Sequence, residues 1–292
     1  MLFTGSGVAI VTPFLDNGEI DYKTYEQLIE FHIESGTDAI VVIGTTGEAA
    51  TLSTDEKREI IKFTVDKTNN RIPVIAGTGG NNTRETINWS EEVSNMGVDA
   101  LLVVTPYYNK ASTQGLVDHF TKIADASNVP IILYSVPGRT ALDIPVQTVV
   151  TLSKHDNIIG LKDATADLNY TAHVRRLVSD DFALYSGNDD IIVPFMALGG
   201  QGVISVVANS MPSETSEMCH AFLNGDTKRA QELQLMMLPF IDTLFVEASP
   251  IPIKSAMALQ GFGKNALRLP LSSATEETRD QLKTEMQKLQ LI

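Results

Sequence analysis

Four short segments of the sequence end apolar runs with side chains that can act as nucleophile, proton carrier or anion ligand. They are GTTGE (44–48), TPYYNK (105–110), YSVPGRT (134–140) and LKDAT (161–165). Lys162 follows the apolar residues IIGL, where burial disfavours a charged ammonium, and a nearby Arg139 adds repulsion. A neutral amine attacks a carbonyl and forms a Schiff base. The iminium withdraws electrons, so carbon–carbon bonds can form or break without a metal or organic cofactor.

The neighbouring hydroxyls and the arginine fit the remaining requirements of such a reaction. Tyr134 could carry the protons that imine formation requires. Thr45 and Thr46 offer hydroxyls and backbone N–H groups to an anion, and Arg139 offers a fixed cation to a carboxylate. Each residue type alone is more often structural: a threonine that satisfies a turn, or a tyrosine packed in a core. Their joint occurrence therefore predicts an active site.

Eight short, β-branched apolar runs supply the elements that must position these residues. Near-continuous apolarity without strict alternation is typical of strands buried on both faces of a parallel sheet. Segments of helical period separate the runs, and the order indicates an α/β fold. We predict a (β/α)8 TIM barrel over residues 1–224 and a C-terminal helical extension over 225–292. The runs are residues 7–12, 39–44, 73–78, 100–105, 130–135, 158–163, 182–187 and 202–207.

Active sites of such barrels lie at the carboxyl ends of the strands, where the four polar segments fall. The Gly-rich segment GTGGNN (77–82) also ends a strand and could hold a phosphate. A dinucleotide-binding spacing fails at Asn82, so we prefer a tight turn before a helix capped near that residue.

The C-terminal extension could cover the barrel or form an oligomer surface. Lys254 in the extension is expected to pack its stem and keep its ammonium in solvent.

Composition excludes several other classes of protein. The chain has 292 residues, 43% hydrophobic content and a formal net charge of −14. It can bury a core but presents no basic patch for nucleic acid or an anionic membrane. Cys219 is the single cysteine and is expected to be a core thiol, and the five histidines show no ligand spacing, so we expect no metal. No signal peptide or membrane span is apparent, which predicts a cytoplasmic protein.

Six motifs together resemble the dihydrodipicolinate synthases, which belong to the pyruvate-dependent class I aldolase and N-acetylneuraminate lyase superfamily. The motifs are GTTGEAATL, TPYYNK, YSVPGRT, IIGLKDAT, YSGNDD and GGQGVISV, in this order over nearly the whole chain. KDAT with YSGNDD is most similar to members from Gram-positive bacteria. The resemblance implies condensation of pyruvate with L-aspartate 4-semialdehyde through a lysine Schiff base, in lysine and diaminopimelate biosynthesis.

The matching motifs imply a role for each candidate residue. Lys162 would form the Schiff base and Tyr134 would transfer protons. Thr45 would join Tyr134 to Tyr108, which in this family enters the site of a neighbouring subunit of a homo-oligomer. The resemblance leaves dimer and tetramer open and implies no cofactor. The substrate-binding residues would be Thr46 for the pyruvate carboxylate, Arg139 for the semialdehyde carboxylate, and Gly187 and Ile204 for the pocket wall.

The sequence departs from the family pattern at two positions, and two alternative functions remain to be considered. Many members have Asn at Ser135 and Glu at Asp163, which leaves the shape of the pocket open. N-acetylneuraminate lyase shares the lysine, but Arg139 favours the synthase, because the semialdehyde has a carboxylate and a sugar acid needs neutral hydrogen-bonding partners. A catalytically silent barrel that acts as a binding or scaffold protein would not need Lys162 and both tyrosines.

Regulation is a further point on which the sequence departs from some members. Lysine-inhibited members of the family bind lysine in a cleft at the dimer interface. Lys57 places a cation at one of the cleft positions, where it would repel a ligand ammonium, so we expect L-lysine to inhibit weakly or not at all. The cleft positions shared with those members are Asn81, Glu85 and Tyr107, and the altered ones are Ala49, Thr54 and Lys57.

Overall fold

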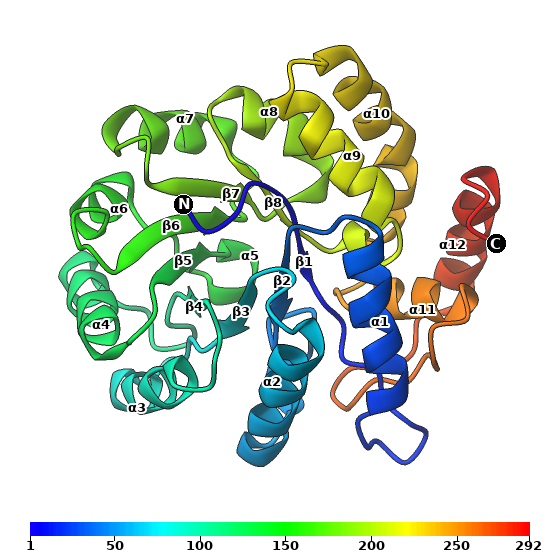
Figure 1. Cartoon of the computed structure of the whole chain (residues 1–292), viewed down its shortest axis with the longest axis horizontal. Helices are drawn as coiled ribbons and strands as arrows, with labels where there is room; N and C mark the ends of the chain where they lie inside the picture. The colour runs from blue at the N-terminus through cyan, green and yellow to red at the C-terminus, as the bar shows by residue number, and fades with distance from the viewer.

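A closed barrel of eight parallel strands forms the centre of the protein, in a computed structural model that describes all 292 residues (Figure 1). The strands are β1 (Gly5–Ala9), β2 (Ala39–Val42), β3 (Val74–Gly77), β4 (Ala100–Val104), β5 (Ile131–Ser135), β6 (Ile158–Asp163), β7 (Ala183–Ser186) and β8 (Gly202–Ser205). Each strand pairs with its neighbours in the chain, and β1 pairs with β8 to close the ring. The predicted TIM barrel is confirmed.

Helices alternate with the strands and surround the barrel (Figure 1). Ser53 and Glu56 form a reciprocal capping box at the start of α2 (Thr54–Thr68). Asn82 accepts hydrogen bonds from two backbone N–H groups of α3 (Thr83–Ser94), which confirms the predicted cap near that residue. These elements are α1 (Tyr22–Glu34), η1 (Ala49–Thr51), α2 (Thr54–Thr68), α3 (Thr83–Ser94), α4 (Thr113–Ala126), α5 (Pro137–Thr140), α6 (Val146–Leu152), α7 (Leu168–Leu177), η2 (Asp189–Ile191), α8 (Ile192–Ala197), η3 (Val207–Asn209) and α9 (Pro212–Leu223).

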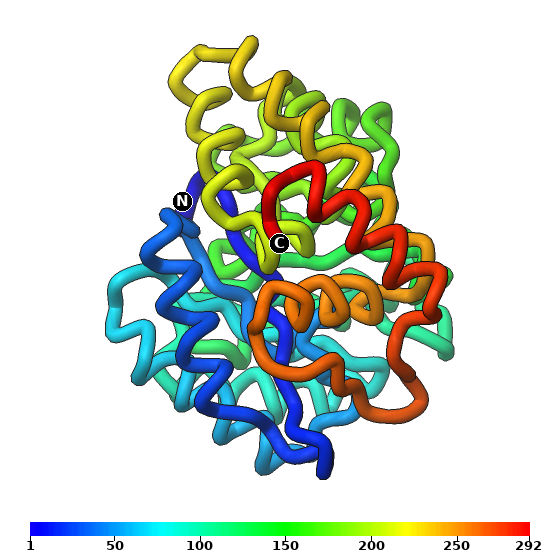
Figure 2. Tube along the Cα trace, turned by 90° about the vertical axis from the view of Figure 1, so that its right-hand side faces the viewer, coloured from blue at the N-terminus to red at the C-terminus, as the bar shows by residue number.

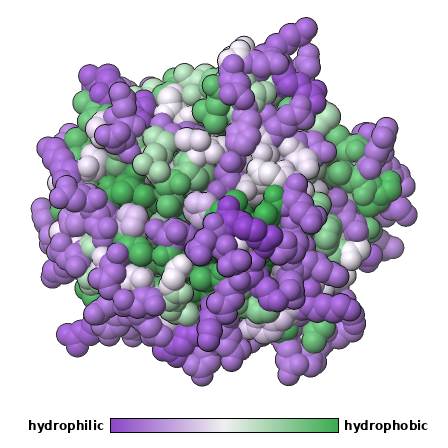
Figure 3. All heavy atoms as spheres, viewed as in Figure 1, coloured by the Kyte–Doolittle hydropathy of each residue, from purple (hydrophilic) through white to green (hydrophobic).

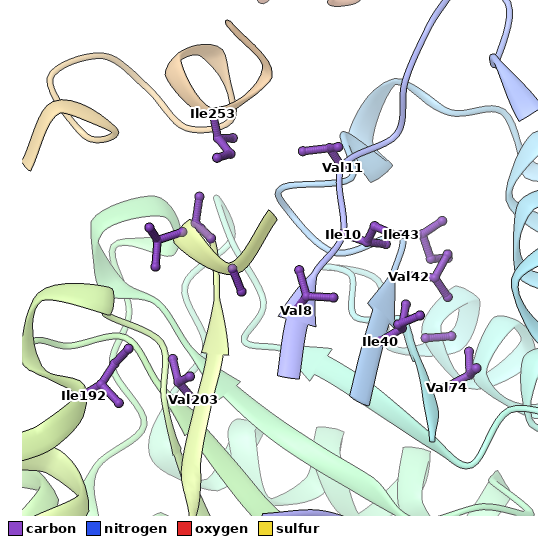
Figure 4. Packing of buried hydrophobic residues seen from close by; sticks show 14 of the residues in the cluster. Val8, Ile10, Val11, Ile40, Val42, Ile43, Val74, Ile192, Val203 and Ile253 are labelled. Atoms are coloured by element: carbon purple, nitrogen blue, oxygen red, sulfur yellow. The ribbon is translucent and has the colours of Figure 1, made fainter. Parts of the chain in front are cut away.

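The strands are buried on both faces, which explains their near-continuous apolar sequence. In β5, Ile132 and Tyr134 belong to a cluster of 13 buried residues, whereas Ile131 and Leu133 belong to a separate cluster of 55. Successive side chains of a strand point to opposite faces, so the small cluster fills the barrel and the large one packs the strands against the helices. Figure 4 shows part of the larger cluster, with Val8, Ile40 and Val203 projecting from neighbouring strands.

The first strand begins and ends earlier than the apolar run predicts. We expected residues 7–12, but β1 covers Gly5–Ala9. Gly5 pairs with Gly202 across the barrel seam, where a Cβ atom on Gly202 would lie 1.9 Å from the Gly5 carbonyl oxygen. This close approach is open only to glycine. Most other strands also end one or two residues before their apolar runs, which leaves the polar residues that follow them in turns.

Three helices form the C-terminal extension: α10 (Thr227–Thr243), α11 (Ile251–Leu259) and α12 (Glu276–Lys288). Helix α10 lies beside α9 in Figure 1, and α11 and α12 lie along one flank of the molecule in Figure 2, in orange and red. Ile253 of α11 points toward the ends of the strands, near Val11 (Figure 4). The extension therefore covers part of the barrel.

The prediction for Lys254 is wrong. Its side chain is only 2% exposed, and its ammonium forms an ion pair with the fully buried Glu48. The amphipathic period of a short helix indicates which face is buried, but it does not reveal that a carboxylate lies in the opposing surface. The lysine head is consequently inside the protein rather than in solvent.

The outer surface is mixed in character. Polar residues (purple) predominate around the face seen in Figure 3, with apolar residues (green) between them.

Cys219 is fully buried, as expected for a core thiol, and burial raises its pKa. None of the helices combines the length and the apolar content that a membrane span requires.

Candidate active site

Lys162 and Tyr134 lie side by side on adjacent strands inside the barrel. They are direct partners in the pairing of β5 with β6, and the Lys162 ammonium lies 4.5 Å from the centre of the Tyr134 ring. Their exposed fractions are 5% and 7%, and most of their neighbours in the barrel interior are apolar. The structure therefore brings together an amine and a phenol in a largely dry environment, as the sequence predicts.

A cavity of about 360 Å³ opens at the carboxyl ends of β2 to β5 and joins three of the predicted residues, Thr45, Tyr134 and Arg139. Lys162 lies next to the Tyr134 ring rather than in the cavity wall. The remaining wall comes from three regions: Ile43, Gly44, Glu48, Ala49, Ala50 and Thr51 after β2; Lys57, Gly77, Thr78, Gly79, Trp89, Leu102, Val104 and Tyr107 from β3, β4 and their flanks; and Ser249, Pro250, Pro270 and Leu271 of the extension.

The turn after β2 presents free hydrogen-bond donors. The backbone N–H groups of Thr45, Thr46 and Gly47 form no hydrogen bond within the chain, whereas the next N–H, of Glu48, donates to the Thr45 carbonyl. Thr46 is 4% exposed and Thr45 is half-buried at the cavity. Adjacent free N–H groups beside hydroxyls are of the kind that can bind an anion, and of these three residues Thr45 lines the cavity.

Arg139 is exposed on the short helix α5 and is oriented by the extension. Its Nη2 donates a hydrogen bond of 2.6 Å to the Ser249 carbonyl oxygen. No carboxylate of the chain pairs with it. A guanidinium has five N–H donors, so four remain for a ligand in the cavity. An unpaired arginine at a cavity mouth can bind a carboxylate through two parallel hydrogen bonds.

The structure does not bring Tyr108 to the cavity of its own chain. Tyr108 is 94% exposed and has a φ of 71°, which is unfavourable for a non-glycine residue. Its loop is fixed on both sides: Asn81 Nδ2 donates to the Tyr107 carbonyl and Asn109 Nδ2 donates to the Asn81 carbonyl. Tyr107, not Tyr108, lines the cavity.

The two predicted wall residues from β7 and β8 lie at the barrel end but outside this cavity. Ile204 on β8 packs in the barrel interior with Tyr134 and Tyr185. The Gly187 N–H donates to the Asp163 carbonyl, and a Cβ atom on Gly187 would lie 2.6 Å from the side chain of Ala164. Any larger residue there would displace the end of β6, two residues from Lys162.

The two departures from the family point away from the site. The Asp163 carboxylate accepts hydrogen bonds from the hydroxyls of Thr165 and Thr171, and Ser135 Oγ accepts one from the Ile144 N–H. Both residues follow an inward-facing residue of a strand, so their side chains lie on the helix side of the barrel. The shape of the pocket thus does not depend directly on either side chain.

Sequence reasoning missed Asp189 in η2, which is completely buried near Lys162. Its carboxylate accepts hydrogen bonds from the N–H groups of Val206 and Val207, at 3.0 and 2.8 Å. Burial raises the pKa of this carboxyl, while its hydrogen bonds and the charge of Lys162 lower it. The motif YSGNDD contains the residue, but nothing local distinguishes it from the neighbouring Asp190.

Glu48 was also missed. It directly follows the turn at Thr45, Thr46 and Gly47, is fully buried, and contacts the extension. A signal was present in the sequence, because a glutamate within an apolar Gly-rich segment needs a buried partner. No pattern in the sequence identified Lys254 as that partner.

A closed parallel barrel with a buried lysine and tyrosine on adjacent strands, next to a cavity at the carboxyl ends, defines the class of (β/α)8-barrel lyases. Within this class, the chain belongs to the dihydrodipicolinate synthetase family, whose sequence profile matches residues 2–289.

Individual relatives resemble the chain over its full length. A 4-hydroxy-tetrahydrodipicolinate synthase from Clostridium tetani is 51% identical over 292 residues, which are 100% of this chain and 99% of that protein. The chloride-inhibited dihydrodipicolinate synthase from Acinetobacter baumannii, complexed with pyruvate, superposes with a TM-score of 0.97 at 43% identity and 99% coverage of both chains. A monomeric dihydrodipicolinate synthase variant superposes with a TM-score of 0.98 at 37% identity, over 100% of this chain and 98% of that one.

The chain is therefore an enzyme with 4-hydroxy-tetrahydrodipicolinate synthase activity, in lysine and diaminopimelate biosynthesis. Its substrates are pyruvate and L-aspartate 4-semialdehyde. The predicted similarity to members from Gram-positive bacteria is confirmed by the clostridial relatives.

Proposed function

We propose that Lys162 forms the Schiff base of this reaction and that Tyr134 transfers its protons. The observation that carries the proposal is the 4.5 Å contact between the Lys162 ammonium and the Tyr134 ring in the barrel interior. The neutral amine attacks the ketone carbon of pyruvate, and loss of water gives the imine. Removal of a proton from the methyl group then gives an enamine, whose carbon attacks the aldehyde of the second substrate.

The remaining steps release the lysine. The amino group of the semialdehyde attacks the imine carbon, closes a six-membered ring and expels Lys162 as an amine. A phenol next to the imine carbon can give and take the protons of these steps. Tyr134 is held for this role by strand pairing on both sides, with Val104 of β4 and Lys162 of β6.

The two substrate carboxylates are assigned to separate groups. The free N–H groups and the hydroxyls of Thr45 and Thr46 would hold the pyruvate carboxylate; of the two threonines, Thr45 lines the cavity together with Tyr134. Arg139, which lines the same cavity, would hold the semialdehyde carboxylate. Gly187 and Ile204 would form the pocket wall around Lys162. A cation at Arg139 disfavours a polyhydroxylated sugar acid such as N-acetylneuraminate.

We further propose a homo-oligomer in which Tyr108 completes the relay of a neighbouring subunit through Thr45. Tyr108 is 94% exposed and has a left-handed backbone conformation, which the hydrogen bond from Asn81 to the Tyr107 carbonyl helps to fix. This conformation costs free energy, which burial of the ring against a neighbouring subunit would offset. Tyr108 does not line the cavity that contains Thr45 of its own chain. Residues 225–292 are proposed to act as an extension of the 1–224 barrel rather than as a separate domain, because Ser249 and Pro250 line the cavity.

Borohydride trapping tests the central assignment. Reduction in the presence of pyruvate should leave one stable adduct per chain on the peptide that contains Lys162, and Lys162→Ala should abolish it. Lys154→Ala, which removes an exposed lysine, is the matched control. An adduct that persists in Lys162→Ala would show that another amine carries the chemistry. A coupled assay with the semialdehyde, run beside one with N-acetylneuraminate, compares the two candidate substrates.

A further inference from the structure

The buried ion pair between Glu48 and Lys254 joins two parts of the chain that are 206 residues apart. The ammonium lies 2.5 Å from Glu48 Oε1 and 4.2 Å from the centre of the Phe14 ring. The side chains are 0% and 2% exposed. The pair thus connects helix α11 to the residue that directly follows the turn at Thr45, Thr46 and Gly47.

Further hydrogen bonds hold the same turn from the side of β1. Lys254 Nζ donates to the Thr12 carbonyl at 2.8 Å, and Thr12 Oγ1 donates to the Gly47 carbonyl at 2.7 Å. The end of the turn is therefore fixed at two successive residues, by the Gly47 carbonyl and by the Glu48 carboxylate. Lys254 contributes to both attachments, since it also orients Thr12.

Glu48 is held in an unfavourable conformation by its partners. Its φ is 55°, in the left-handed region that favours glycine. The second carboxylate oxygen accepts a hydrogen bond from the Arg268 N–H, and the Arg268 side chain in turn binds Glu56 and the Thr51 carbonyl. Since this backbone conformation orients the preceding N–H groups, the attachments of the carboxylate determine the geometry of the anion-binding turn.

Stability alone does not explain a charged pair at this position. Removing two charges from water costs free energy that apolar residues of similar size would not cost. Burial lowers the pKa of Lys254 to about 8, even though Glu48 opposes this shift, which reflects that cost. The other charge facing the ammonium is Arg268, which lowers the pKa further. A directional ion pair fixes the position of the turn more narrowly than apolar packing does.

We propose that Glu48 and Lys254 are positioning residues for the pyruvate site: their ion pair holds the free N–H groups and hydroxyls of the turn in the geometry that binds the pyruvate carboxylate. This rests on the proposed role of Thr45 and Thr46. Arg139 is oriented by the main-chain carbonyl of Ser249 and not by the side chain of Glu48 or Lys254, so loss of the ion pair should impair the use of pyruvate and leave semialdehyde binding largely intact.

Steady-state kinetics of Glu48→Gln test the proposal. We expect kcat/KM for pyruvate to fall about tenfold or more, through a raised KM for pyruvate, while the KM for the semialdehyde stays within about twofold of wild type. Asp38→Asn is the control: Asp38 accepts a hydrogen bond of 2.7 Å from Ser6 at the opposite end of the barrel. It should lower the melting temperature without changing either KM in the folded enzyme.

Thr12→Val keeps the proposal testable if Glu48→Gln folds poorly, and a double variant tests it where the single variants fold. Thr12→Val preserves side-chain volume, removes only the hydrogen bond to Gly47, and should raise the KM for pyruvate in the same selective way. In the double variant Glu48→Gln/Lys254→Met, the loss in kcat/KM for pyruvate should be clearly smaller than the product of the two single losses, because the residues act as one unit.

Four results would overturn the positioning role: an unchanged KM for pyruvate in Glu48→Gln, equal increases in both KM values, losses that multiply in the double variant, or changes in Asp38→Asn that match those in Glu48→Gln. Trapping of the Lys162 adduct separates this proposal from the chemical assignment. If Lys162→Ala still forms the adduct, the proposed chemistry fails whatever Glu48 does. If wild type forms it at Lys162 and Glu48→Gln leaves the KM for pyruvate unchanged, only the positioning role fails.

Discussion

The Arg139 guanidinium donates a hydrogen bond of 2.6 Å to the main-chain carbonyl of Ser249, 110 residues further along the chain. Ser249 is 8% exposed and lies two residues before the start of α11. The cation proposed to bind the semialdehyde carboxylate is thus aimed by the backbone of the extension. A carbonyl oxygen leaves the positive charge of Arg139 uncompensated, which a carboxylate partner would not do.

Arg139→Lys should raise the KM for the semialdehyde by about tenfold or more, with a much smaller change for pyruvate. A single ammonium cannot bond to the Ser249 carbonyl and hold a carboxylate through two parallel hydrogen bonds at once. Steady-state kinetics with each substrate varied in turn measure the difference. Arg176→Lys, at an exposed arginine without an ion pair, should behave as wild type. Equal effects on both substrates would mean that the carboxylates are assigned wrongly.

Tyr108→Phe should lower kcat by about 100-fold and leave the yield of the borohydride-trapped pyruvate adduct nearly unchanged, because the variant removes a proton carrier and not a binding group. A variant forced to be monomeric should show a similar loss. The control is Tyr22→Phe, whose hydroxyl contacts Glu59 outside the cavity. A monomer with full activity, established by sedimentation together with the assay, contradicts a site shared between subunits.

L-lysine should inhibit weakly, with a half-inhibition point above about 1 mM, which corresponds to roughly −4 kcal/mol of binding. Lys57 lines the same cavity as Thr45, and none of the ion pairs of the chain includes it. Burial lowers its pKa, so it lies in surroundings that screen charge poorly. A cation about 4 Å from a ligand ammonium costs on the order of 4 kcal/mol at an effective dielectric near 20, before screening.

The variant Lys57→Gln removes this repulsion and should make inhibition by L-lysine stronger. Lys62→Gln, in the same helix but outside the cavity, is the matched control. Inhibition curves at fixed pyruvate compare the three enzymes. Half-inhibition of wild type well below 1 mM would show that Lys57 does not repel the ligand.

The free energy of unfolding should fall in acid because of His32. This residue is fully buried in α1, and burial lowers its pKa from 6.5 to about 3. Between these values the unfolded chain binds a proton that the folded chain does not, so stability falls as the pH drops from 6.5 toward 3. At pH 5 the difference is about 2 kcal/mol relative to neutral pH.

Urea unfolding from pH 7 to pH 5 measures this contribution. His32→Met should flatten the pH dependence by about 2 kcal/mol, although the variant is less stable overall because it loses the contact with Thr37. His173→Gln removes an exposed histidine and should leave the slope unchanged. An unaltered slope in His32→Met would show that folding does not lower the pKa of this histidine.

The sequence by itself determined the barrel and the core of the candidate site. Eight apolar runs, each followed by a helical segment, predict the strand order, because both periodicities are local. The alternation along a strand and the carboxyl-end rule then place Tyr134 and Lys162 beside each other, as the strand pairing bears out. The motifs shared with the family could also be recognised from the sequence, because each is local: a short strand end with the turn that follows it.

Only the tertiary structure decided which charged residues meet inside the protein. Lys254 and Glu48 are 206 residues apart, and Arg139 and Ser249 are 110 apart, so no local pattern predicts either contact. No local pattern predicts the exposure of Tyr108 either, because it depends on the hydrogen bond from Asn81 to the Tyr107 carbonyl, which positions the loop. Hydrophobic burial is non-directional and is encoded by the pattern of residue types, whereas ion pairs and hydrogen bonds require particular atoms to lie within about 3 Å, which only the complete packing fixes.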